Sequence, residues 1–316
     1  MTLLSTPRRC DFMPIFYHKV KWFGDRQRFR VYLGRLALMR QHTLKNSLSF
    51  RGIGVHTGRE INMMVHPSDG GSIRFRRLDL GGVEIDPQLA RIESGHCSGL
   101  NSPEGGVKTV EHLMAALYML GVDSVLVEVD GPEVPIMDGS AQPFAESLIA
   151  AGLQPLDSEK SVFKVIRPFR LSRGEAFMNV EPDDRFRVTY SIDFDHVAIG
   201  RQEISFELDL DAFLLEIAPA RTFGFQKDVD ALRKSGLAKG AALTNTVVLD
   251  ERRVVNGPLR YRDEFVRHKI LDLVGDLALF GRPLNGHFAV TCGGHDLHHK
   301  LVRYLRDHPE MLSSAS

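Results

Sequence analysis

Two residues of types that bind metal ions lie four positions apart in the second half of the sequence, as His268 and Asp272. On a helix this spacing places both side chains on one face, about 40° apart around the axis, so that one cation could contact both. Asp276 lies one further turn along, on roughly the same side. The same spacing is also typical of an ion pair on a solvated helix surface.

The other face of this predicted helix bears on the choice between a metal site and a surface ion pair. That face carries apolar side chains: Val266, Ile270, Leu273, Val274 and Leu277. Such a pattern predicts a well-buried helix. Three ionisable groups on the remaining side are then difficult to explain as surface residues, which favours a functional site.

A second group of candidate residues is TVEH, residues 109–112, at the start of a predicted helix. His112 is a nitrogen ligand suited to zinc, and Glu111 beside it could act as a base without binding the metal. In the first helical turn the dipole would favour the ionised form of Glu111. Two histidines and one aspartate would leave a fourth position open, as in catalytic zinc sites. A capping role is the alternative for Glu111.

A third candidate is His295, which follows two glycines and a predicted strand. Glycines allow a close approach of the backbone, and a loop histidine near a metal would suit a general acid. A surface turn is the alternative interpretation, because His298 and His299 follow immediately and we expect both to be solvated.

The segment ARTFGF, residues 220–225, is the fourth candidate. The hydroxyl of Thr222 could hold an oxyanion, and the ring of Phe223 could lie against a sugar. Outside such a site, these residues would be ordinary core and turn residues.

The elements that would position these groups can be outlined from hydrophobic periodicity. We expect Thr109 to cap a helix that ends at Gly121, and a long helix to span about residues 263–280. Strands followed by helices in each half predict an α+β fold with two layers packed face to face. The polar segment 154–160 contains a proline, so we place a domain boundary there. The first domain would span residues 43–157 and the second residues 158–316.

Composition narrows the class of protein. The 316 residues have a formal net charge of zero, but residues 1–42 carry nine Lys or Arg against two acidic residues, which leaves the remainder acidic. An acidic body is a poor nucleic-acid binder, because phosphate binding needs cations. Three scattered cysteines without a CxxC motif favour a reducing compartment. No apolar run approaches the roughly 18 residues of a membrane span. These features predict a cytoplasmic protein without stable membrane insertion.

The first 42 residues have a broken, Arg-rich pattern unlike the rest. We expect them to be a disordered N-terminal extension, with Met39 as the functional start. A targeting peptide is an alternative, although the segment lacks the Ser enrichment of such leaders. A basic arm that contacts a membrane surface is another.

Six segments in order, from about Leu44 to Leu305, resemble the UDP-3-O-acyl-N-acetylglucosamine deacetylase family. They are GIGVHTG (52–58), TVEHLMAAL (109–117), PEVPIMDGSAQPF (132–144), ARTFGF (220–225), DEFVRHKILDLVGDL (263–277) and GGH (293–295). The resemblance implies an enzyme of lipid A synthesis that removes the N-acetyl group from a UDP-linked 3-O-acylglucosamine. We expect it to act as a monomer.

The resemblance also implies roles for individual residues. Zinc, or iron(II) in the same site, would be bound by three side chains: His112, His268 and Asp272. Glu111 would be the general base, and His295 the general acid, oriented by Asp276. Thr222 would stabilise the oxyanion. Phe223 would pack on the sugar ring of the substrate, and Lys269 would contact the nucleotide phosphates. His56 would lie at the edge of the site.

The fold implied by the resemblance has two β-α-α-β-like domains with their helices sandwiched between two sheets. A βαβ unit inserted in the second domain, here at about residues 224–249, would form the tunnel for the acyl chain. The chain departs from the family pattern in its first 42 residues. It also has Glu181 where some members carry a phosphate-contacting lysine, next to the matched Pro182.

Overall fold

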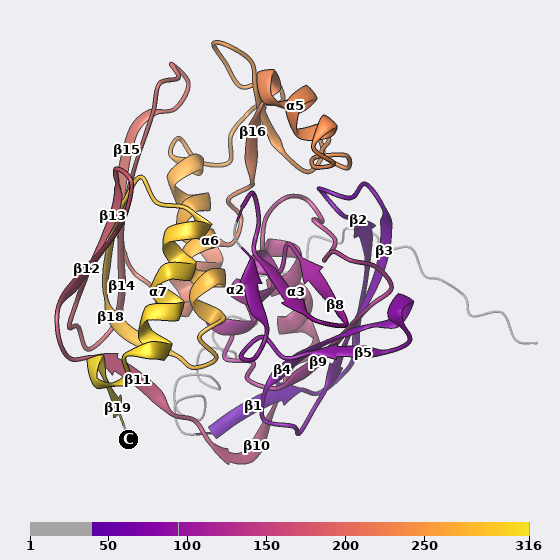
Figure 1. Ribbon diagram of the computed structural model, residues 1–316, viewed down its shortest axis with the longest axis vertical. Helices are drawn as coiled ribbons and strands as arrows, with labels where there is room; N and C mark the ends of the chain where they lie inside the picture. Colours follow the sequence, from indigo (N-terminus) through magenta and orange to yellow (C-terminus); the bar gives the residue numbers. More distant parts are fainter. Residues whose placement is uncertain (1–39, 94, 316) are drawn as a thin grey trace, which may run out of the picture. The chain divides into compact units, whose positions relative to one another are not determined.

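Two large β-sheets, one from each half of the chain, enclose α-helices in the computed structural model (Figure 1), which describes residues 40–93 and 95–315. The helices between the sheets are α2 (Glu111–Met119), α3 (Gln142–Ala151), α6 (Glu264–Ala278) and α7 (His295–Asp307). The predicted α+β architecture with sandwiched helices is therefore confirmed.

The sheet of the first half has five strands in the order β2-β3-β9-β4-β5, antiparallel except for the β4–β9 pair. Alternate residues of β3, such as Ile61, Met63 and Val65, are fully buried, because side chains of a strand point alternately to its two faces. A smaller sheet, β6-β7-β8, precedes α2. The strands of the two sheets are β2 (Leu48–Ile53), β3 (Glu60–Pro67), β4 (Ile73–Arg77), β5 (Val83–Ile85), β6 (Arg91–Glu93), β7 (Gly99–Ser102), β8 (Gly105–Lys108) and β9 (Val125–Val129).

The sheet of the second half has seven strands around β18, which pairs with β13, β14 and β11. Hairpins add β12 to β13 and β15 to β14, and β19 pairs with β11. β18 ends at Thr291, three residues before Gly294, so this strand leads directly to the start of α7. The strands are β11 (Val162–Val165), β12 (Phe169–Arg173), β13 (Ala176–Glu181), β14 (Phe186–Phe194), β15 (Gly200–Glu207), β18 (Leu284–Thr291) and β19 (Leu312–Ala315).

The predicted insertion is present as a βαβ unit in the second half. Strand β16 (Phe223–Phe225) pairs in parallel with β17 (Val247–Leu249), and α5 (Val229–Lys234) lies in the connection between them. Parallel neighbours require such a crossover. Phe223 and Thr222 therefore lie at the entry of the inserted unit. Before it, a short helical stretch is formed by α4 (Leu210–Ala212) and η2 (Phe213–Ile217).

Helices α2 and α6 cross closely, and a glycine makes this possible. A Cβ atom at Gly275 would overlap the carbonyl oxygen of Glu111, the first residue of α2. Only glycine therefore lets the backbones approach this far. All residues of α6 are buried except Arg267 and Lys269, so α6 is enclosed on nearly every side. The crossing brings Glu111, at the start of α2, against Gly275 of α6.

Three local expectations differ from the structure. Residues 40–42, expected in the N-terminal extension, belong to β1 (Arg40–Leu44); residues 1–39 lie outside the described part. The polar segment 154–160, in which the domain boundary is expected, contains most of β10 (Leu153–Glu159), which pairs with β1. The predicted domain boundary near this strand stays a prediction.

The third difference concerns Thr109, which does not cap α2. Its backbone adopts φ of 58°, and the cap position is Val110, without a side-chain hydrogen bond. The hydroxyl of Thr109 donates instead to Glu133 over 2.8 Å.

Among residues 40–93 and 95–315, no helix is both long and apolar enough to span a bilayer.

Candidate active site

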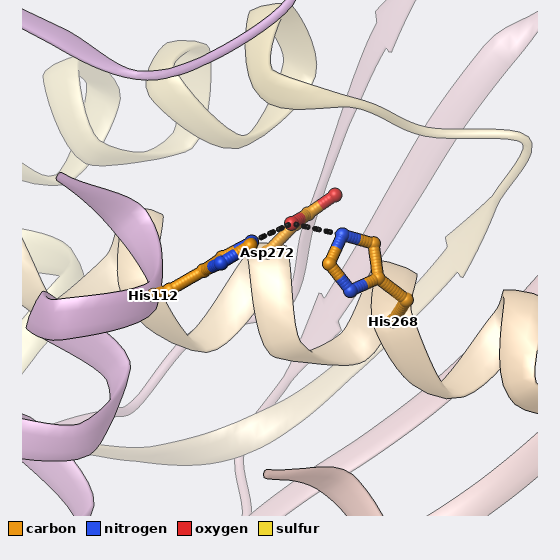
Figure 2. A group of neighbouring side chains, drawn as sticks. All are labelled: His112, His268 and Asp272. Carbon is orange, nitrogen blue, oxygen red and sulfur yellow. Dashed lines mark ion pairs between the residues drawn. The ribbon is translucent and has the colours of Figure 1, made fainter. Parts of the chain in front are cut away.

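His112, His268 and Asp272 converge at the crossing of α2 and α6 (Figure 2). Nε2 of His268 lies 3.3 Å from Oδ1 of Asp272, and Nε2 of His112 lies 3.8 Å from the same oxygen. One candidate ligand atom from each residue lies within 4.8 Å of the others, and all three side chains are buried. The predicted ligands are thus brought together from two separate halves of the sequence.

The donor set fits a divalent metal ion. Two imidazole nitrogens and one carboxylate oxygen are the ligands of a catalytic site that keeps an open position. Nδ1 of His268 lies 3.0 Å from the carbonyl oxygen of Ala220, so it donates its proton there and leaves Nε2 for a cation. Burial lowers the pKa of both histidines, that of His112 to about 3 with help from His268, so both imidazoles are neutral. Neutral imidazole is the form that binds metal.

Asp272 is held ionised by its neighbours. Burial alone would raise the pKa of its carboxyl, but the neighbouring His268 and Lys269 outweigh burial and lower it well below its usual range. Nζ of Lys269 donates to Oδ2 of Asp272 over 2.9 Å. In this arrangement Lys269 contacts the ligand set, and its predicted contact with nucleotide phosphates stays a prediction.

Glu111 lies beside the metal-ligand group and is 4% exposed. Its Oε2 accepts a hydrogen bond from the backbone N–H of Ser98 over 3.1 Å, so it does not act as a cap. Burial raises the pKa of Glu111 to about 8. The helix dipole was expected to favour the ionised carboxylate, but desolvation is the larger effect at this depth. A cation on the adjacent ligands would favour the ionised form again.

His295 begins α7 and faces the same space from the other side. Its Nε2 lies 3.9 Å from both Oε1 of Glu111 and Oδ2 of Asp272. Its Nδ1 donates to Oδ2 of Asp276 over 2.7 Å. Burial would lower the pKa of His295, but Asp276 outweighs burial and raises it to about 9. The imidazolium required of a general acid is therefore stable at neutral pH.

The surroundings of Asp276 contain residues that the sequence did not predict to be functional. His298 and His299, expected to be solvated, are fully buried and lie within hydrogen-bonding distance of Asp276. Ser98, from the loop before β7, donates to Oδ1 of Asp276. A signal for His298 existed, because it lies at helical spacing from apolar residues of α7: Leu301, Val302 and Leu305.

Thr222 and Phe223 approach the site from the inserted unit. The ring of Phe223 lies edge-on to His268 with centroids 6.3 Å apart, and Nζ of Lys269 lies 5.6 Å above the Phe223 ring. The backbone N–H of Thr222 donates to the carbonyl oxygen of Gly139 over 2.8 Å, which ties this segment to the first half of the chain. Phe223 thus lies next to the ligand group, as its predicted contact with the sugar requires.

His56 lies in a loop that is organised by one buried carboxylate, Glu133. This side chain accepts from the backbone N–H groups of His56 and Thr57, both over 2.9 Å, and from the hydroxyls of Thr57 and Thr109. Nδ1 of His56 lies 3.4 Å from the backbone N of Ala238 in the inserted unit. Burial lowers the pKa of His56, so its imidazole is neutral. Glu133 was not predicted to matter, although it lies in one of the quoted segments.

Comparison with known proteins identifies the family. The family model of UDP-3-O-acyl N-acetylglycosamine deacetylase matches residues 41–307. The chain belongs to this family. The deacetylase, so named, of Thermodesulfovibrio yellowstonii is 40% identical over 267 residues, which cover 84% of this chain and 91% of the relative. That of Acidithiobacillus ferrooxidans is 42% identical over 275 residues, 85% of this chain and 90% of the relative.

A further deacetylase, from Nitratidesulfovibrio vulgaris, is 42% identical over 282 residues, 88% of this chain and 91% of the relative. The match covers nearly the full length of each relative, and the family model covers this chain from β1 to the end of α7. The family resemblance inferred from six sequence segments is thereby confirmed.

Proposed function

We propose that this chain is a metal-dependent deacetylase of lipid A synthesis. It hydrolyses the N-acetyl amide of UDP-3-O-acyl-N-acetylglucosamine and yields the free amine and acetate. One observation carries the proposal. In a member of the deacetylase family, a two-histidine, one-aspartate ligand set lies between a carboxyl group and an imidazolium, with Nε2 of His295 3.9 Å from both Glu111 and Asp272.

The metal would be held by His112, His268 and Asp272, and we propose zinc, with iron(II) as the alternative. When bound, such a cation acts as a Lewis acid that makes water a better nucleophile and polarises the amide carbonyl. The chain itself orients the ligands, because the carbonyl of Ala220 fixes the tautomer of His268. Burial of the site keeps bulk water from competing with the ligands.

Glu111 and His295 would divide the proton transfers. Glu111 accepts a proton from the attacking water as the new C–O bond forms at the amide carbon. Nε2 of His295 donates its proton to the amide nitrogen as the C–N bond breaks, so the amine leaves in a neutral form. Asp276 holds Nδ1 of His295 and stabilises its charge. Such positioned acids and bases each contribute roughly 10²- to 10⁴-fold to a rate.

Four residues would contact the substrate. The hydroxyl of Thr222 would stabilise the negative charge on the carbonyl oxygen, a contribution of about 3 kcal/mol for a well-aimed donor. Phe223 would pack on the sugar ring, Lys269 would contact the nucleotide phosphates, and His56 would lie at the edge of the site. The inserted unit β16–α5–β17 would guide the acyl chain.

The setting of the enzyme is proposed from the sequence. We propose a cytoplasmic monomer that does not bind nucleic acid, and two domains that meet near residue 157. The positive charge and broken pattern of residues 1–42 also lead us to propose that this segment is dispensable for catalysis up to Met39, because residues 40–42 belong to β1. A chain that starts at Met39 would then retain full activity.

The function is tested with the full chain. The protein is stripped with a chelator, reloaded with Zn²⁺ or Fe²⁺ and incubated with UDP-3-O-acyl-N-acetylglucosamine. Release of one acetate per free amine, detected by mass spectrometry, is expected only after reloading. UDP-N-acetylglucosamine, which lacks the acyl chain, is the control substrate and should react more slowly. Absence of product with either metal would contradict the proposal.

A further inference from the structure

The carboxylate of Asp276 is surrounded by hydrogen-bond donors. Its Oδ2 accepts from Nδ1 of His295 over 2.7 Å and from Nδ1 of His298 over 2.8 Å. Its Oδ1 accepts from the hydroxyl of Ser98 and lies 3.2 Å from Nε2 of His299. A carboxylate has about four lone-pair sites, so the available sites are filled. The position of Asp276 is therefore determined by several groups besides His295.

His298 is the member of this group that also contacts the sheet of the second half. It is fully buried on α7, three residues after His295. Its Nε2 lies 3.0 Å from the hydroxyl of Tyr190, a fully buried residue of β14. Because Nδ1 faces a carboxylate, it carries the proton, and Nε2 then accepts from the Tyr190 hydroxyl. Tyr190, His298 and Asp276 thus form a hydrogen-bonded chain from the second sheet to His295.

A second metal ion is the alternative explanation, since Asp276, His295 and His298 each offer a ligand atom within 4.8 Å of the others. The contacts favour hydrogen bonds. Nδ1 of each histidine already lies at 2.7 or 2.8 Å from the same Oδ2 atom, which is the length of a charge-assisted N–H···O bond. A cation would need both nitrogens deprotonated, and it would have to separate them from the carboxylate.

We propose that His298 is a positioning residue for the deacetylation reaction, which with Tyr190 fixes Asp276 and thereby aims Nε2 of His295 at the leaving nitrogen. This inference rests on the proposed function of His295. His298 does not contact the substrate, so its loss lowers kcat and leaves KM and the bound metal unchanged. The role requires a donor at the position of Nδ1, and the hydrogen bond from Tyr190 to Nε2 helps to hold that donor in place.

The test compares two substitutions at the buried position of His298. His298→Asn keeps an N–H donor near the position of Nδ1, whereas His298→Leu keeps the volume and removes the donor. We expect kcat of the Leu variant to fall about 10- to 100-fold, as for a lost hydrogen bond to a charged group. We expect the Asn variant to recover to within roughly threefold of wild type. Metal content should stay at one ion per chain, and KM should not change.

Two further variants keep the test decisive. Tyr190→Phe removes only a hydroxyl, and we expect a fall in kcat of about two- to tenfold, as for a neutral hydrogen bond. His42→Leu removes a buried imidazole from β1 and should leave kcat unchanged.

The outcomes separate the two proposals. Wild-type kcat in His298→Leu, or an equal loss in the Asn and Leu variants, would overturn the positioning role while the deacetylase function stands. Two metal ions per wild-type chain and one in His298→Leu would also overturn it, in favour of a second cation site. An inactive wild-type enzyme would overturn both.

Discussion

The site has a metal side, formed by His112, His268 and Asp272, and an acid side, formed by His295 and Asp276. The two sides are held in place by different interactions. On the metal side, Nδ1 of His268 has one partner, and Nδ1 of His112 has none within residues 40–93 and 95–315. On the acid side, Asp276 alone has partners in three histidines and one serine. The metal side depends mainly on the crossing of two helices, with one hydrogen bond from Lys269 to Asp272 and one from His268 to Ala220, whereas the acid side depends on a group of hydrogen bonds. This difference suits the proposed functions. Metal ligands must keep lone pairs available for the cation, whereas a general acid must be oriented toward the leaving nitrogen.

Among variants that keep the metal, the largest effect should come from removing the base, Glu111, while the metal ligands and the partners of Asp276 stay in place. Glu111→Gln keeps the shape of the side chain and the contact with Ser98 but cannot take a proton. We expect kcat to fall roughly 10²- to 10⁴-fold, with one metal ion per chain retained. Turnover and metal content of the same preparation check this. A variant with kcat near wild type would transfer the base role to another group.

The helix crossing is tested at Gly275. Gly275→Ala adds a Cβ where the Glu111 carbonyl oxygen lies, so α2 and α6 must separate. A displacement of about 1 Å at reacting groups costs on the order of 100-fold in rate. We expect that loss, together with a fall of about 1–3 kcal/mol in the free energy of unfolding. Turnover measurements check the loss in rate, and urea denaturation checks the loss in stability.

Gly224→Ala is the matched control for Gly275→Ala, because a Cβ at Gly224 would meet no neighbouring atom within 4 Å. It should leave metal affinity and stability nearly unchanged. If Gly275→Ala also behaves like wild type, the close crossing is not what assembles the metal side.

In the metal-free protein, the free energy of unfolding should depend on pH through Glu111 and His295. Without metal, burial raises the pKa of Glu111 to about 8, and Asp276 raises that of His295 to about 9 against the effect of burial. A group whose pKa is raised in the folded state contributes stability that is complete below its unfolded pKa and lost as pH rises through the folded pKa. Histidines with lowered pKa values, such as His112, affect stability only below about pH 6.5, where they take up protons in the unfolded state. The free energy of unfolding of metal-free protein should therefore fall between about pH 7 and pH 9.

Thermal melts of the chelated protein across this range test the sign. In Glu111→Gln the part of the loss below about pH 8 should be smaller, because the titrating carboxyl is gone. Stability that rises with pH over the same window would show that these two groups are not the ones that titrate.

The sequence alone predicted those site residues that lie on one helix, but not those that distant segments bring to the site. Helical spacing placed His268, Asp272 and Asp276 on one face of α6, and the apolar face correctly predicted a buried helix. The expected exposure of His298 and His299 was wrong, because the burial of α7 depends on a sheet from distant segments. Ser98 and Tyr190 carry no local signal, since their partners lie 178 and 108 residues away. Sequence spacing therefore predicts which side chains share one face of a helix. Tertiary packing determines which residues from other segments contact that face.

The smallest effect is expected at the edge of the site. Glu133→Gln replaces an acceptor of four hydrogen bonds by a group whose amide N–H cannot accept, so the loop of His56 loosens. We expect a loss of about 1–3 kcal/mol in stability. KM should rise a few-fold with little change in kcat, because the loop contacts the rim and not the reacting atoms. An unchanged KM together with a large fall in kcat would place Glu133 in the chemistry.

The central claim is that one side of the site holds a metal ion and the other supplies a proton. Metal content and kcat of His268→Ala and His295→Ala, measured on parallel preparations, test it most directly, with His66→Ala on β3 as control. We predict that His268→Ala loses both metal and turnover. His295→Ala should keep one ion per chain while kcat falls about 100-fold or more. A His268→Ala enzyme with full metal and full turnover, or a His295→Ala enzyme without metal, would contradict this division.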